Sequence, residues 1–120
     1  GAAIEVHKAL GPGLLESVYE TVLADELAHK GFVIERQKPI PIRLRERTFE
    51  EGFRADLVVG RLVLVEIKSV VNLLPVHRKQ VLTYLKLADL RLGLLVNFGA
   101  GTLKGNFERL VNRLDEQEPI

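Results

Sequence analysis

The sequence predicts a mixed α/β domain in which helices flank a central mixed sheet, in the order helix, helix, three strands, helix, strand. Three observations carry this prediction. Apolar residues recur every three or four positions over residues 14–31, which predicts an amphipathic helix. Residues 48–59 alternate and residues 62–68 are rich in β-branched side chains, which predicts a hairpin. Pro75 opens a further apolar stripe of helical period, which ends before Gly93.

The composition fits one globular domain over residues 1–120. Hydrophobic residues make up 47% and charged residues 28%, so a chain of this size can bury a single core. The lack of cysteine excludes disulfides and cysteine-ligated zinc. No apolar run approaches the ~20 residues that a membrane-spanning helix needs. No secretory signal opens the chain, so we expect a cytoplasmic protein without a membrane partner, and leave open whether a native segment precedes Gly1.

Two helices are expected at the start of the chain. The first covers residues 2–10 and ends at residues 11–13, because two glycines and a proline break a continuing helix. The second begins near Leu14, buries one apolar face, and ends where Gly31 can cap it.

The strands differ in how far they can be buried. Residues 33–44 contain two prolines, which cannot donate ladder hydrogen bonds, so we expect at best an edge strand. Residues 94–96 form an apolar run typical of a strand buried on both faces. The tail leaves two alternatives open, a helix that extends to Leu114 or a short strand over residues 107–111. Alternation along residues 48–59 predicts two opposite faces, one with Phe49, Phe53, Ala55 and Leu57 and the other with Arg54, Asp56 and Val58.

Three charged residues within the predicted hairpin form a candidate site. Asp56 is followed after nine residues by Glu66, and period-two alternation puts Glu66 and Lys68 on the same face. Carboxylates in such an apolar strand are costly to bury unless they pair or bind a cation. Their oxygens suit Mg²⁺, which typically takes one or two carboxylates plus waters and substrate phosphate. A neighbouring lysine can orient the attacking water and offset charge on the phosphate.

The length of the hairpin loop decides whether the two carboxylates meet. A two-residue loop would turn the Asp56 carboxylate away from Glu66. A three-residue loop, residues 60–62, would pair Val59 with Val63 and set Asp56 opposite Glu66, and a bulge would do the same. Because a metal site requires the two carboxylates to meet, we predict an odd loop or a bulge.

Two helical pairs of polar residues accompany the hairpin. Glu16 lies in the first turn of the second helix, and Tyr19 lies one turn on, on the same side. Gln80 and Tyr84 are four residues apart on the later helix and share a face. Each residue also has a structural reading, with Glu16 as a first-turn acid favoured by the helix dipole and the tyrosines as core residues.

Taken in order, these residues resemble a known family. The spacing of Gly13, Glu16 and Tyr19 matches the GxxExxY protein family. The later residues resemble the RecB-type branch of the PD-(D/E)XK nuclease superfamily: Asp56, Glu66, Lys68, Gln80 and Tyr84. The resemblance covers nearly the whole chain and departs from the superfamily's name at Ala55, where proline is expected. It implies a restriction-endonuclease-like fold and hydrolysis of a phosphodiester bond that leaves a 5′-phosphate.

The resemblance also implies a role for each residue. Mg²⁺, for which Mn²⁺ can substitute, would be held by Asp56, Glu66 and the carbonyl of Ile67, with Glu16 as a further acidic ligand or water holder. Lys68 would position the nucleophilic water. The helical pair Gln80 and Tyr84 would orient Lys68, the metal site or the substrate strand.

Three classes of function stay open. The first is a metal-dependent nuclease acting on DNA, or else RNA, and the second is a nucleic-acid-binding module without turnover. The third is a protein-interaction domain in which Asp56 and Lys68 form a plain ion pair. The net charge of +1 neither demands nor excludes a polyanion. Because so small a domain offers little surface to a duplex, we expect a homodimer or a partner protein to extend it; the cutting mode and sequence preference stay open.

Overall fold

The computed structural model describes residues 1–112 and contains three helices and five strands within that range. In chain order these are α1 (Ala2–Leu10), α2 (Glu16–His29), β1 (Ile34–Leu44), β2 (Arg47–Val59), β3 (Val63–Lys68), α3 (Pro75–Ala88), β4 (Leu92–Asn97) and β5 (Phe107–Val111). The predicted mixed α/β class is confirmed, and β5 adds a strand at the end. Of the two alternatives for the tail, the strand is correct, and Leu114 lies outside the described residues.

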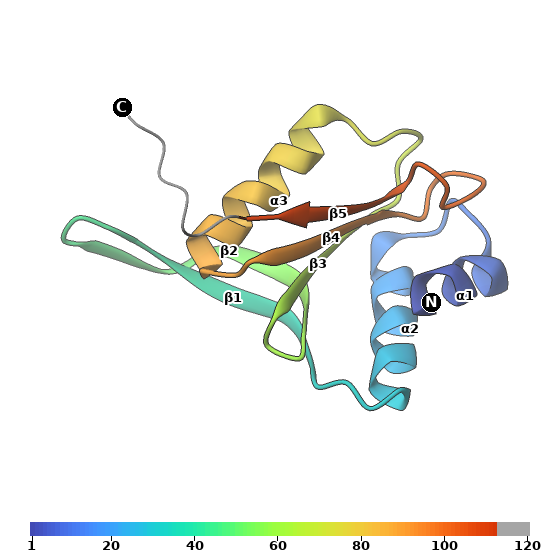
Figure 1. Ribbon diagram of the computed structural model, residues 1–120, viewed down its shortest axis with the longest axis horizontal. Helices are drawn as coiled ribbons and strands as arrows, with labels where there is room; N and C mark the ends of the chain where they lie inside the picture. Colours follow the sequence, from blue (N-terminus) through green and yellow to red (C-terminus); the bar gives the residue numbers. More distant parts are fainter. Residues whose placement is uncertain (113–120) are drawn as a thin grey trace.

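The five strands form one sheet whose spatial order follows the chain, β1-β2-β3-β4-β5 (Figure 1). Neighbouring strands are antiparallel except for β3 and β4, which are parallel because α3 forms the crossover between them. β1 lies at the edge of the sheet, as its prolines predict.

Side-chain alternation along β3 divides the core into two clusters on opposite faces of the sheet. Val65 and Ile67 pack against α1 and α2, whereas Leu64 packs against α3. The α1/α2 cluster includes Val6, Tyr19, Leu23, Leu57, Val96 and Phe98, and the α3 cluster includes Ile40, Phe53, Ala55, Val58, Val81, Leu85 and Leu95. The central strands are therefore covered on both faces.

Strict alternation along β2 is a prediction that the structure corrects. Phe53 and Ala55 pack in the α3 cluster, but Val58 joins them there, while Leu57 packs on the α1/α2 face. The alternation breaks between Ala55 and Leu57, next to the last pair of the β2–β3 ladder.

Tyr19 fixes the turn that leads into α2. Its fully buried ring stacks on Phe98, with centroids 4.5 Å apart. Its hydroxyl donates to the Gly11 carbonyl at 2.6 Å and accepts from the Leu14 N–H at 3.0 Å. α2 thus begins at Glu16, two residues after the predicted start, and Tyr19 has the structural role of orienting that start.

The outer parts of β1 and β2 project beyond the other strands (Figure 1). We call this segment, residues 42–49, the arm. Its strands pair with each other from Ile42 opposite Phe49 to Leu44 opposite Arg47. Leu44 and Phe49 are half or more exposed, so the arm lies outside both core clusters.

Candidate active site

The hairpin of β2 and β3 has the three-residue loop that the sequence predicts. Val59 pairs with Val63, which leaves residues 60–62 in the loop. The same register sets Asp56 opposite Glu66, so the predicted register is confirmed.

Side-chain carboxylates replace backbone acceptors where this ladder ends. Beyond the last pair, Leu57 with Val65, the Asp56 N–H donates to Glu66 Oε1 at 3.2 Å. In return, the Ile67 N–H donates to Asp56 Oδ2 at 2.8 Å. These reciprocal hydrogen bonds hold both carboxylates in a fork between the strands. We call Asp56 and Glu66 the carboxylate pair.

Burial makes the carboxylate pair costly to ionise. Glu66 is 4% exposed, and its desolvation, followed by the charge of Asp56, raises the pKa of Glu66 to about 8. Desolvation also raises the pKa of Asp56, although the hydrogen bond from Ile67 opposes the shift. The charge of Lys68 lowers the pKa of Glu66, yet within residues 1–112 no ion pair joins Lys68 to either carboxylate.

The chemistry of the carboxylate pair fits a divalent cation. Two buried carboxylates that repel each other are stabilised by a hard cation, and Mg²⁺ needs only one or two carboxylates from the protein. Ile67 lies in direct contact with the pair through its backbone. Among residues 1–112 no group of three or more His, Cys, Asp or Glu side chains could hold a metal ion, so the structure brings no third such side chain to the carboxylate pair.

Glu16 reaches the same end of β3 from the first turn of α2. Its Oε2 accepts from the Ser69 N–H at 3.2 Å, one residue beyond Lys68. The Ser69 hydroxyl donates to the Leu14 carbonyl at 2.6 Å, which ties the entry of α2 to the end of β3. Glu16 therefore lies beside the strand end that carries Glu66, without completing a three-acid metal cluster in the described part of the chain.

α3 brings Tyr84 and Gln80 to the site. Burial raises the pKa of Tyr84, and so do the charges of Glu66 and Asp56, while a hydrogen bond with Gln80 lowers it. The Tyr84 ring stacks on Phe53 of β2, with centroids 3.9 Å apart. The structure thus brings Gln80 and Tyr84 together, and the electrostatic field of the carboxylate pair reaches Tyr84.

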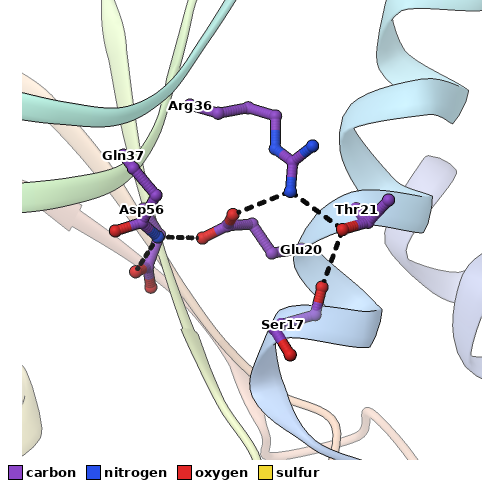
Figure 2. Close-up of polar contacts among 6 residues, drawn as sticks. All are labelled: Ser17, Glu20, Thr21, Arg36, Gln37 and Asp56. Atoms are coloured by element: carbon purple, nitrogen blue, oxygen red, sulfur yellow. Dashed lines mark hydrogen bonds and ion pairs between the residues drawn. The ribbon is translucent and has the colours of Figure 1, made fainter.

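A chain of three residues that sequence reasoning did not include in the site leads from Asp56 to α2 (Figure 2). Glu20 is 5% exposed and accepts from Arg36 Nη2 at 3.1 Å. The Gln37 amide donates to the other oxygen of Glu20 and to Asp56 Oδ1, the latter at 3.4 Å. The only signal in the sequence is that Glu20 follows Glu16 by four residues and so shares its helix face.

One of three comparisons with known proteins identifies a superfamily for this chain. The model of the PD-(D/E)XK nuclease superfamily matches residues 1–110, nearly all of the described chain. Neither the curated proteins nor the solved structures yielded a significant match. None of the helices within residues 1–112 combines the length and the apolarity needed to cross a membrane. Since the family match spans the sheet, the fork and the flanking helices, the chain belongs to the PD-(D/E)XK nuclease superfamily.

Proposed function

We propose that this protein is a metal-dependent nuclease that hydrolyses phosphodiester bonds in DNA, with RNA as the alternative substrate. The observation that carries the proposal is the carboxylate pair, since Asp56 and Glu66 hold each other in the fork while Glu66 is almost fully buried. Buried like charges with raised pKa values are typical of functional sites. We also place the chain in the GxxExxY family, on the spacing of Gly13, Glu16 and Tyr19.

Each site residue has a role in this proposal. Mg²⁺ or Mn²⁺ supplies Lewis acidity and lowers the pKa of a bound water. The oxygen donors that would hold it are Asp56, Glu66, the carbonyl of Ile67 and, as a further ligand or water holder, Glu16. Lys68 orients the attacking water and offsets charge on the phosphate. Gln80 and Tyr84 orient Lys68 or the substrate strand.

The reaction is an in-line displacement at phosphorus. The water oxygen forms a bond to phosphorus and gives up one proton to solvent, and the bond from phosphorus to the 3′ oxygen breaks as that oxygen takes up a proton from solvent. One product then carries a 5′-phosphate and the other a 3′-hydroxyl. Lys68 is the cation of the chain that lies nearest in sequence to Glu66, which supports its role beside the reacting phosphate.

Basic side chains on the arm support nucleic acid as the partner. Arg43, Arg45 and Arg47 are exposed, and none forms an ion pair within the described residues. Arginine contacts to phosphate oxygens position proteins on a duplex without reading its sequence. A homodimer or a partner protein would widen the contact surface of so small a domain.

Cleavage of labelled single- and double-stranded DNA and RNA tests the proposal. Wild type should cut in Mg²⁺ or Mn²⁺ and not in EDTA. Glu66→Gln and Lys68→Met should both lose cleavage, whereas the matched control Glu50→Gln, at an exposed site near the arm, should retain it.

Two outcomes would contradict the proposal. If wild type is inert and calorimetry detects no binding of Mg²⁺ or Mn²⁺, the carboxylate pair is a structural cluster. If the protein binds DNA in a salt-sensitive way but never cuts it, a binding module without turnover is the correct assignment.

A further inference from the structure

Gln37 interrupts the regular conformation of β1. Its φ is 47°, in the left-handed region that residues other than glycine rarely adopt, although residues on both sides of it keep their pairing with β2. Such backbone conformations concentrate at functional sites. Here the conformation accompanies a side chain that lies between Glu20 and Asp56 (Figure 2).

Gln37 donates one of the two hydrogen bonds that the Asp56 carboxylate accepts. Ionised carboxylates only accept hydrogen bonds, so the amide nitrogen of Gln37 is the atom that faces both Glu20 and Asp56. Asp56 Oδ2 accepts from the Ile67 N–H at 2.8 Å, and Asp56 Oδ1 accepts from Gln37 at 3.4 Å. Both oxygens of the carboxylate are thus contacted, one from β3 and one from β1.

Glu20 anchors Gln37 to α2. Its side chain is almost fully buried, and its second oxygen accepts from Arg36 at 3.1 Å. Arg36 also donates to Thr21 Oγ1 at 2.8 Å, and the Thr21 hydroxyl donates to the Ser17 carbonyl at 2.9 Å. The amide of Gln37 is therefore fixed relative to the helix as well as to the strand (Figure 2).

We propose that Gln37 is a positioning residue, which sets the rotation of the Asp56 carboxylate so that it can bind a divalent cation, and that Glu20 holds Gln37 in place. This inference rests on the proposed function, because it assigns Asp56 to the metal site. Partners that orient metal ligands typically change metal affinity 10–100-fold when they are removed. Neither Gln37 nor Glu20 touches the cation or the substrate in this proposal.

Calorimetric titration with Mn²⁺, in the absence of nucleic acid, measures the effect directly. Gln37→Met keeps the length of the side chain and removes its donors, so we expect Mn²⁺ affinity to fall about tenfold. Gln37→Gly also lacks the donors but accepts a φ of 47° without steric conflict, so it provides a second variant should Gln37→Met fail to fold. The matched control is Lys38→Met, the same replacement at the next residue, whose ion pair is with Glu35.

A second measurement separates positioning from a direct role in the reaction. In Gln37→Met, the Mg²⁺ concentration for half-maximal cleavage should rise about tenfold, while saturating Mg²⁺ should restore the rate to within about threefold of wild type. A purely structural Gln37 would instead lower the thermal midpoint and leave Mn²⁺ affinity unchanged.

The outcomes distinguish this inference from the proposed function. If wild type binds Mn²⁺ and both Gln37 variants bind it within twofold of wild type, the inference is wrong and the proposed function stands. If wild type binds no divalent cation, both are wrong. Loss of affinity in both Gln37 variants, with Lys38→Met unchanged, supports the inference.

Discussion

The two ends of β2 lie in contrasting surroundings. Near the loop, residues 57–59 pair with both β1 and β3 and are buried. On the arm, β2 pairs with β1 alone, and side chains such as Phe49 are exposed. Asp56 lies at the boundary, next to the last ladder pair between β2 and β3. The candidate site thus lies where β2 leaves the packed sheet, because there the Asp56 carboxylate takes the place of a backbone acceptor and is held by the Ile67 N–H.

The largest expected effect is on catalysis at this boundary. Asp56→Asn keeps the shape of the side chain and removes its charge, so kcat/KM for DNA cleavage should fall about a thousandfold, or about 4 kcal/mol of transition-state stabilisation. Glu50→Gln makes the matched change on the outer part of β2 and should leave kcat/KM within twofold. If the two variants lowered kcat/KM equally, the two ends of β2 would not differ in their contribution to cleavage.

The next effect is on stability. Leu57 is fully buried and Leu44 is 65% exposed. Leu57→Ala should lower the free energy of unfolding by about 2–5 kcal/mol, because it leaves a cavity in the α1/α2 cluster. Leu44→Ala should change it by less than ~0.5 kcal/mol. Urea denaturation of the two variants measures both values, and a similar loss in each would mean that the arm is packed in solution.

A third effect is the pH dependence of stability without divalent cations. From about pH 4.5 to pH 8 the folded state keeps a proton on Glu66 that the unfolded state releases. The folded state therefore binds more protons, so the free energy of unfolding should fall as pH rises, by on the order of 3 kcal/mol. Urea denaturation at pH 5 and pH 8.5 should show this fall in wild type and in Glu50→Gln, and a much smaller fall in Glu66→Gln.

The smallest effect on stability is expected on the arm. Replacing Arg43, Arg45 and Arg47 together by alanine should change the free energy of unfolding by less than ~0.5 kcal/mol for each residue. DNA binding should nevertheless weaken, and the slope of log affinity against log salt should decrease by about 0.9 for each duplex phosphate contact that is lost. Lys8→Ala, an exposed change on α1, is the control. An unchanged salt slope would exclude the arm from the DNA interface.

Local spacing explains why the hairpin could be predicted. The side-chain period of two links the register to the length of one loop, and the three-residue loop was chosen because a metal site requires Asp56 to meet Glu66. Pro75 and the apolar stripe after it predicted α3 in the same way. The roles of the site residues, by contrast, depend on chemistry that cleavage and binding experiments must test.

The surroundings of Asp56 could not be predicted, because they depend on packing between distant segments. Glu20 on a helix surface is an ordinary solvated acid until β1 packs over it. A glycine at position 37 would have suggested a positive φ, but a glutamine does not predict the observed φ of 47°. The break in alternation at Asp56 likewise has no counterpart in the local pattern of residues 48–59.

The fork has a consequence for spectroscopy. Most amide protons in a sheet donate to backbone carbonyls, but those of Asp56 and Ile67 donate to side-chain carboxylates. Their chemical shifts and their exchange with solvent therefore respond to any change in charge on Glu66 and Asp56, whether by a proton or by a cation. Two backbone resonances thus serve as built-in probes of the state of the site.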